Sequence, residues 1–348
     1  MKSQTLYQFF LYLIAKDKWK DVLKITLAFL LIGIVFSRTN IQNIIAVWDI
    51  ISWPWLLVSV AVFFAMTVVK AVQYWALFDS RVPYLQVLRV ATFQNALTNL
   101  VSNAAGIASY LTMFRVEQNV KLKHSGAIFI ITKAGDLFSM AFFLLLSAWL
   151  VWARTNILHQ LVLLVLGVVF LALLVFWTAV FFRQKFILQL HRITHWMRLD
   201  RASIIERGLN MLQSVAEQEQ RTVVRMFLLG LTLSMSYMTL TMAYSYSRIQ
   251  TFHIPLDLWA IVFVASLMQF VSIIPIQILG GLGINEVTLL YLYGLFGITQ
   301  VDLPAILVGL RVLFYLFNLA LLLYMPIDTF VSRVKSAGKN KKDRLNEG

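Results

Sequence analysis

Long apolar stretches, separated by short polar segments, make up most of this chain. A helix that crosses a bilayer needs about 20 mostly apolar residues. Six stretches approach or exceed this length, and we predict transmembrane helices over residues 22–36, 53–78, 126–152, 161–182, 223–246 and 303–330. A signal peptide is the alternative for the first stretch, but Ser37-Arg38-Thr39 is a poor small-residue cleavage site. We therefore interpret residues 22–36 as a retained anchor.

Two further apolar stretches, 85–116 and 257–298, are each broken near the middle. The first contains Ser-Asn-Ala-Ala-Gly at 102–106, and the second contains Pro275 followed by Gly280, Gly281 and Gly283. Proline and clustered glycines end helices. Within a bilayer such a break is tolerated only where protein or a water-filled cavity satisfies the backbone. We predict that both stretches are re-entrant helical hairpins.

Composition supports a membrane protein: 60% of the 348 residues are hydrophobic, 13% are charged and the formal net charge is +14. A soluble domain carries about 25% charged residues, which excludes an ordinary soluble enzyme. Cysteine is absent, which excludes disulfides, thiolate nucleophiles and cysteine metal sites.

The basic residues are concentrated in four segments. Residues 1–24, 79–124, 183–225 and 333–348 hold 24 of the 30 lysines and arginines, whereas Arg38, Arg154 and Arg248 are predicted on the other side. Because cytoplasmic flanks are rich in lysine and arginine, we predict cytoplasmic N- and C-termini. This distribution is typical of an orientation signal, so we expect no nucleic-acid partner.

The segment 183–222 mixes basic and apolar residues and is typical of one or two interfacial helices. His191 and His195 lie four residues apart on it, without the glutamate of a zinc-protease motif. We therefore expect no metal site.

The two halves of the chain share one plan. Residues 20–152 and 153–330 each read as span, span, broken hairpin and span, and a basic tail, 331–348, follows. The two halves begin on opposite sides of the membrane. We therefore predict a single membrane domain, 1–348, that is all-α and polytopic, with about six spans and two hairpins in an inverted-topology repeat. Paired interrupted segments in such a repeat indicate a binding site near the midplane.

Charged residues within spans are costly and usually functional. Lys70 lies near the predicted inner end of its span, and we expect it to snorkel to the surface. Lys133 and Asp136 lie on one helix face and either pair with each other or face a ligand. Glu286 follows the glycine break, where it either caps a half-helix and bridges to Arg311 or takes part in function.

Polar residues in the hairpins suggest a ligand. Asn95, Asn99 and Asn103 recur every four residues, and such a row either lines a cavity or joins helices. Half-helices that begin near Gly106 and Gly283 would present free N–H groups to an anion. We therefore expect an anionic headgroup between the two hairpin tips.

These motifs resemble a family of flippase-like membrane proteins related to the transmembrane region of lysylphosphatidylglycerol synthase. The resemblance covers about residues 20–330. It is carried by Pro275, Gly280, Gly281, Gly283, Glu286, Gly297, Ile298 and Arg311, and in the first half by Arg115 and Asp136. Lys133 stands where an arginine is common in the family. Ile107 stands after Gly106 where the family usually has an acid.

The resemblance implies movement of an anionic, aminoacylated or polyprenyl-phosphate-linked lipid between leaflets of a bacterial inner membrane. It implies no synthase reaction, and the sequence has no P-loop motif for nucleotide hydrolysis. We expect no enzymatic activity, cofactor or metal. The predicted substrate-binding residues are Asn99, Asn103, Gly106, Arg115, Lys133, Gly280, Gly281, Gly283 and Arg311, and the predicted proton- or ion-coupling residues are Asp136 and Glu286.

Two other functions stay open. One is a membrane enzyme that acts on a lipid phosphate, and the other is a lipid-binding accessory subunit that transports nothing. The expected partners are a membrane lipid and a lipid-modifying synthase or glycosyltransferase.

Overall fold

A computed structural model describes residues 47–78, 82–117, 120, 122–196, 203–273, 281–298 and 303–323. Every regular element in these ranges is a helix. The predicted anchor at 22–36 and the basic tail at 331–348 lie outside the described residues.

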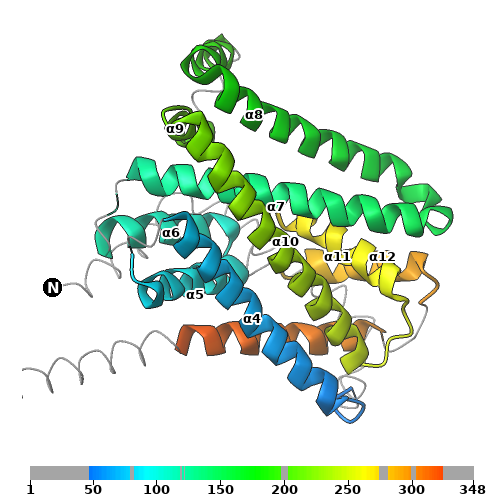
Figure 1. Cartoon of the computed structure of the whole chain (residues 1–348). Helices are drawn as coiled ribbons and strands as arrows, with labels where there is room; N and C mark the ends of the chain where they lie inside the picture. The colour runs from blue at the N-terminus through cyan, green and yellow to red at the C-terminus, as the bar shows by residue number, and fades with distance from the viewer. Residues whose placement is uncertain are drawn as a thin grey trace, which may run out of the picture.

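Five helices are long and apolar enough to cross a membrane. They are Trp53–Leu77 (α4), Lys123–Leu150 within α7 (Leu122–Leu150), Asn156–Leu190, which begins just before α8 (His159–Trp196) and includes most of it, Gln220–Thr251 (α10) and Leu303–Leu323. They coincide with five of the six predicted spans. Short 3-10 turns at Trp152–Arg154 and Asn156–Leu158 join α7 to α8. On α8, many leucine, valine and phenylalanine side chains are exposed, as on a lipid-facing helix. This helix lies at one edge of the molecule (Figure 1). The protein is an all-α, polytopic membrane protein.

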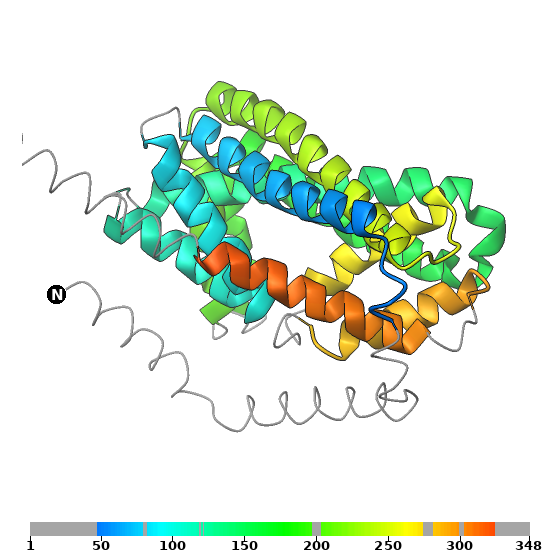
Figure 2. The ribbon, with the colours of Figure 1, turned by 90° about the horizontal axis from the view of Figure 1, so that it is seen from below.

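Helices α4 and α10 form an antiparallel pair across the molecule (Figures 1 and 2). Their ends are joined where the Ser52 N–H donates to the Thr251 carbonyl at 2.9 Å. Further along the pair, the Gln73 amide donates to the Gly230 carbonyl at 2.8 Å and to the Ser234 hydroxyl at 2.7 Å. These buried polar contacts fix the register of the two helices.

The first broken stretch consists of α5 (Tyr84–Leu100) and α6 (Asn103–Glu117), which pack against each other. The chain leaves the helix at Val101 and Ser102 and re-enters it at Asn103, so α6 begins before Gly106. A side chain at Gly106 would overlap the Thr98 hydroxyl of α5. The glycine therefore permits the close approach of the two helices and does not itself form the break.

The second broken stretch consists of α11 (Leu258–Ile273) and α12 (Ile284–Leu295). Gly281 and Gly283 have φ of +79° and +83°, a conformation that favours glycine. Pro275 and Gly280 lie outside the described residues. Two helices around a break are thus present in both stretches, and the re-entrant course and the inverted repeat stay predictions.

The helix α8 changes direction at Arg183, which has φ of 49°. The chain continues to Trp196 and then forms α9 (Ser203–Ala216), so two helical segments occupy the region predicted to hold one or two interfacial helices. The Arg183 guanidinium donates to the carbonyls of Ala216 (3.2 Å) and Gln218 (2.9 Å). These bonds satisfy carbonyls at the end of α9.

Two apolar clusters pack the helices of the broken stretches against the rest of the protein. The first is centred on Tyr74, Tyr110 and Phe114, and it joins α4 to α5, α6 and the start of α7. The second surrounds Phe263 and Leu310, and it joins α11 and α12 to the helix Leu303–Leu323 and to the ends of α7 and α10. The broken stretches therefore lie on either side of the α4–α10 pair (Figure 1).

Candidate functional site

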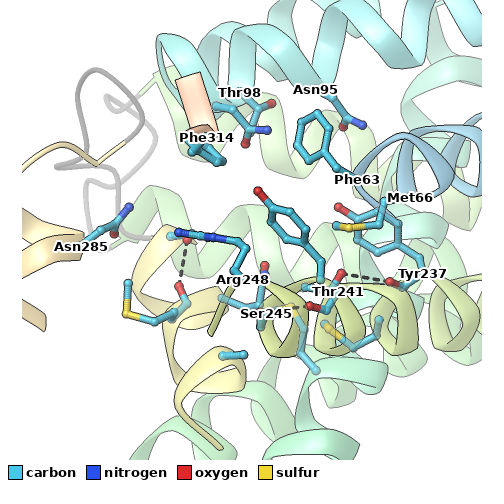
Figure 3. A pocket seen from close by; sticks show the side chains of 18 of the residues that line it. Phe63, Met66, Asn95, Thr98, Tyr237, Thr241, Ser245, Arg248, Asn285 and Phe314 are labelled. Carbon is cyan, nitrogen blue, oxygen red and sulfur yellow. Dashed lines mark hydrogen bonds between the residues drawn. The ribbon is translucent and has the colours of Figure 1, made fainter. Parts of the chain in front are cut away.

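A cavity of about 550 Å³ lies between the two broken stretches (Figure 3). Its walls come from α4, α5, α7, α10, α11, α12 and the helix Leu303–Leu323, with the start of α6. Apolar side chains such as Phe63, Met66 and Phe314 line it together with amides, hydroxyls and charged groups. A lining of this mixed kind suits an amphiphilic ligand.

A buried cluster of charges forms one part of the wall. The Lys70 ammonium lies 2.8 Å from both carboxylate oxygens of Asp136. The Ser234 hydroxyl donates to the same carboxylate at 2.7 Å. The Lys70 side chain is only 6% exposed, so the prediction that it snorkels to the surface was wrong. An acid on a neighbouring helix holds this lysine inside the protein.

Lys133 is the second cation on this carboxylate. Its ammonium lies 3.3 Å from Asp136, and its side chain is 45% exposed. The ammonium also lies 5.7 Å from the ring centre of Phe129, within the range of a cation–π contact. Lys133 thus pairs with Asp136, as one interpretation of the sequence held, and also lines the cavity.

Glu286 has two contacts at the start of α12. One carboxylate oxygen accepts the N–H of Gly283 at 2.6 Å, as in a capping box. The other lies 3.5 Å from Nε of Arg311. The Arg311 guanidinium also lies 4.8 Å from the ring centre of Tyr315. The predicted cap and bridge both exist, and Glu286 and Arg311 both line the cavity.

A described residue of the first broken stretch contacts one of the second. The Asn103 amide at the start of α6 donates to the carbonyl of Ser272 near the end of α11. One turn earlier, the Asn99 amide donates to the side chain of Asn318 at 2.8 Å. The sequence left two interpretations of the asparagine row, and both hold. Asn99 and Asn103 join helices, and they also line the cavity.

Four other predicted substrate-binding residues are described and do not line this cavity: Gly106, Arg115, Gly281 and Gly283. Gly106 lies in the α5–α6 contact, and Gly281 and Gly283 form the turn before α12. Arg115 is exposed near the end of α6. Gly280 lies outside the described residues.

Sequence reasoning missed a polar face of α10. Tyr237, Thr241, Ser245 and Arg248 all line the cavity, and Figure 3 shows Arg248 extending into it towards Asn285. The sequence assigned Arg248 to a flank outside the membrane. The sequence does contain a signal for this face: Arg248 and its polar neighbours are spaced by three or four residues, and residues with that spacing share one face of a helix.

The described lining of the cavity carries an excess of positive charge. Its cations are Lys70, Lys133, Arg248 and Arg311, and its acids are Asp136 and Glu286. Four cations and two carboxylates leave a formal charge of +2, which an anionic ligand would neutralise. Within the described part of the chain, histidine and acidic side chains form no group that could hold a metal ion.

One comparison with known proteins gives a match. The model of one family, described as the lysylphosphatidylglycerol synthase TM region, matches residues 22–321. Among curated proteins and solved structures, none gives a significant match. The match spans most of the chain, including every described residue that lines the cavity. The chain therefore belongs to the family of the lysylphosphatidylglycerol synthase transmembrane region.

Proposed function

We propose that the protein moves an anionic, aminoacylated or polyprenyl-phosphate-linked lipid between the leaflets of a membrane. The observation that carries this proposal is the formal charge of +2 on a cavity between membrane-spanning helices. Such charges are expensive in a bilayer and are retained where they meet a ligand or each other. Membership of a family named for a lipid synthase's membrane region supports a role in lipid handling.

The lining favours a lipid over a small soluble anion. Phenylalanine, methionine and leucine side chains line the cavity together with the charged groups. A phosphate would lie against the cations, and the first carbons of an acyl or prenyl chain would lie against the apolar walls. The apolar contacts would add about 0.8 kcal/mol for each buried methylene.

Asp136 and Glu286 are the proposed coupling residues. They are the carboxylates of the described cavity wall, and each is held by cations that an anionic headgroup would also attract. Arrival of the headgroup would loosen one of these pairs and favour protonation of the freed acid. The proposed setting is a bacterial inner membrane with cytoplasmic termini, where a lipid-modifying synthase or glycosyltransferase would supply the lipid.

Reconstitution of the purified full chain into vesicles tests the proposal. The vesicles would contain phosphatidylcholine with fluorescent phosphatidylglycerol, and a membrane-impermeant reductant would report the label in the outer leaflet. We expect faster exchange between leaflets than in protein-free vesicles. Exchange at the protein-free rate for phosphatidylglycerol and for lipid extracts of the native host would overturn the proposal.

The same samples separate the two alternatives. Chemical conversion of the lipid, detected by mass spectrometry, would indicate a membrane enzyme. Saturable lipid binding without exchange or conversion would indicate an accessory lipid-binding subunit. We expect the lipid to be recovered unchanged.

A further inference from the structure

Arg248 differs from the other cations of the cavity. Lys70 and Lys133 contact Asp136, and Arg311 contacts Glu286. None of the ion pairs among the described residues includes Arg248. Its guanidinium carbon lies 5.3 Å from the ring centre of Tyr244, within the range of a cation–π contact.

Arg248 is also far from the Lys70–Asp136 cluster. That cluster reaches α10 at Ser234, through a hydrogen bond of 2.7 Å. An α-helix rises about 1.5 Å per residue, so Ser234 and Arg248 lie about 21 Å apart along α10. The cavity therefore extends along the α4–α10 pair, with a cationic group near each end.

Polar groups accompany Arg248 at its end of the cavity. Ser245 lies on the same face of α10, and Asn285 faces it from the start of α12 (Figure 3). Arg311 lines the same cavity from the helix Leu303–Leu323. Near this end of α10, Phe252 packs close to Gly309, which precedes Arg311 by about half a helical turn. Arg248 and Arg311 thus approach the same end from two helices.

We propose that Arg248, with Arg311, forms a second anion-binding subsite that takes a phosphate or carboxylate group of the ligand. The inference rests on the proposed function for the identity of that ligand as a lipid. A guanidinium presents several N–H donors in a fixed plane and matches phosphate and carboxylate oxygens in a bidentate manner. The first subsite is the Lys133 side of the Lys70–Asp136 cluster.

The separation of the subsites determines how they are used. The headgroup of a simple phosphate ester is much shorter than about 21 Å, so it occupies one subsite at a time. A headgroup that crosses the membrane would leave the Lys133 subsite and next meet Arg248 and Arg311. Arg248 is then a specificity-determining residue for the half of the path at its end of α10.

Lipid binding by Arg248→Gln tests the second subsite. The full chain in phosphatidylcholine nanodiscs would be titrated with short-chain phosphatidylglycerol, and binding would be measured by native mass spectrometry. We expect the affinity to fall about tenfold, as for the loss of a charge-assisted hydrogen bond. We expect Arg248→Lys to retain most of the affinity because it keeps the charge.

Arg154→Gln is the matched control. Arg154 lies at the same end of the molecule, is 65% exposed and pairs with Asp257 at 2.6 Å outside the cavity. Its replacement removes the same charge and should leave the affinity unchanged. Equal affinities for wild type, Arg248→Gln and Arg154→Gln would overturn the second subsite.

A single-cysteine experiment tests the subsite with Arg248 intact. The chain has no cysteine, so Ser245→Cys introduces one thiol, a single helical turn from Arg248. We expect an anionic methanethiosulfonate reagent to label this thiol, and phosphatidylglycerol to slow the labelling at least about fivefold more than phosphatidylcholine does. Equal protection by the two lipids would overturn the proposal, even if Arg248→Gln fails to fold.

These measurements can overturn the second subsite and the proposed lipid movement independently of each other. Weaker phosphatidylglycerol binding by Arg248→Gln, without leaflet exchange by the wild type, would support the subsite and overturn lipid movement. Leaflet exchange by the wild type, with unchanged binding and exchange in Arg248→Gln, would support lipid movement and overturn the subsite.

Discussion

Lys70 and Asp136 form a bidentate ion pair between α4 and α7, with both oxygens of the carboxylate 2.8 Å from the ammonium. The two residues are 66 positions apart in the sequence and are almost completely enclosed by protein. Removal of one member of a buried pair leaves an uncompensated charge. The pair therefore determines both the stability of the cavity wall and the charge that the ligand meets.

Lys70→Met should destabilise the protein strongly. We expect a loss of about 3 kcal/mol or more, because Asp136 would keep only Lys133 at 3.3 Å and Ser234. Thermal unfolding of the detergent-solubilised protein measures the effect. Lys133→Gln is the control and should cost less than about 1 kcal/mol, because Lys133 is half-exposed. An equal loss in the two variants would contradict the arrangement.

Gly106→Ala should destabilise the contact between α5 and α6. The new methyl group would overlap the Thr98 hydroxyl and lie 3.1 Å from the Gln94 carbonyl. We expect the free energy of unfolding to fall by about 1–3 kcal/mol. Gly167→Ala on α8 is the matched control, because no atom lies within 4 Å of its added carbon, and it should leave the melting temperature unchanged or slightly raised. Equal melting temperatures for Gly106→Ala and Gly167→Ala would contradict the close contact between α5 and α6.

Comparison of Glu286→Gln with Glu286→Ala should distinguish the helix cap that Glu286 provides from the effect of its negative charge. Glutamine can still accept the Gly283 N–H, whereas it loses the attraction to Arg311. We expect both variants to lose lipid movement and stability, because Arg311 loses its buried acidic partner, and the alanine variant to lose about 1 kcal/mol more from the missing cap. Leaflet exchange and thermal unfolding of the same samples measure the two effects. Wild-type exchange by Glu286→Gln would remove this carboxylate from the proposed coupling.

Asn99 and Asn318 should be energetically coupled. Their side chains share a hydrogen bond of 2.8 Å, and Asn318 is fully buried. A double-mutant cycle with alanine at both positions should give a coupling energy of about 0.5–1.5 kcal/mol. The cycle of Asn95 with Asn318, which share no hydrogen bond, is the control. Additive effects of Asn99→Ala and Asn318→Ala would contradict the contact.

The pattern of apolar residues was sufficient to predict most of the fold. Long hydrophobic runs specify spanning helices because the bilayer leaves the backbone few alternatives. The broken stretches were also predictable, although the first break lies at Val101 and Ser102, at the start of the run 102–106 that suggested it. Gly106 marks close helix packing instead, which depends on the position of Thr98 and cannot be read from local sequence.

The site was predictable only in part. Asn99, Asn103, Lys133, Asp136, Glu286 and Arg311 were predicted and line the cavity. The burial of Lys70 was not predicted, because its partner lies on another helix. A lysine near the end of a span is also expected to snorkel. Arg248 was not predicted as a cavity residue, because the sequence analysis assigned lysines and arginines to the segments between spans and did not consider their helix faces. The polar spacing along α10 would have placed it on the face of Tyr237 and Thr241.

The central claim is that the cations of this cavity bind and move an anionic lipid. The most direct measurement compares leaflet exchange of fluorescent phosphatidylglycerol in vesicles that contain wild-type protein, Arg311→Ala or no protein. We predict rapid exchange with the wild type and exchange near the protein-free rate with Arg311→Ala, at equal reconstitution and equal folding by size-exclusion chromatography. Equal exchange by Arg311→Ala and the wild type would contradict the account.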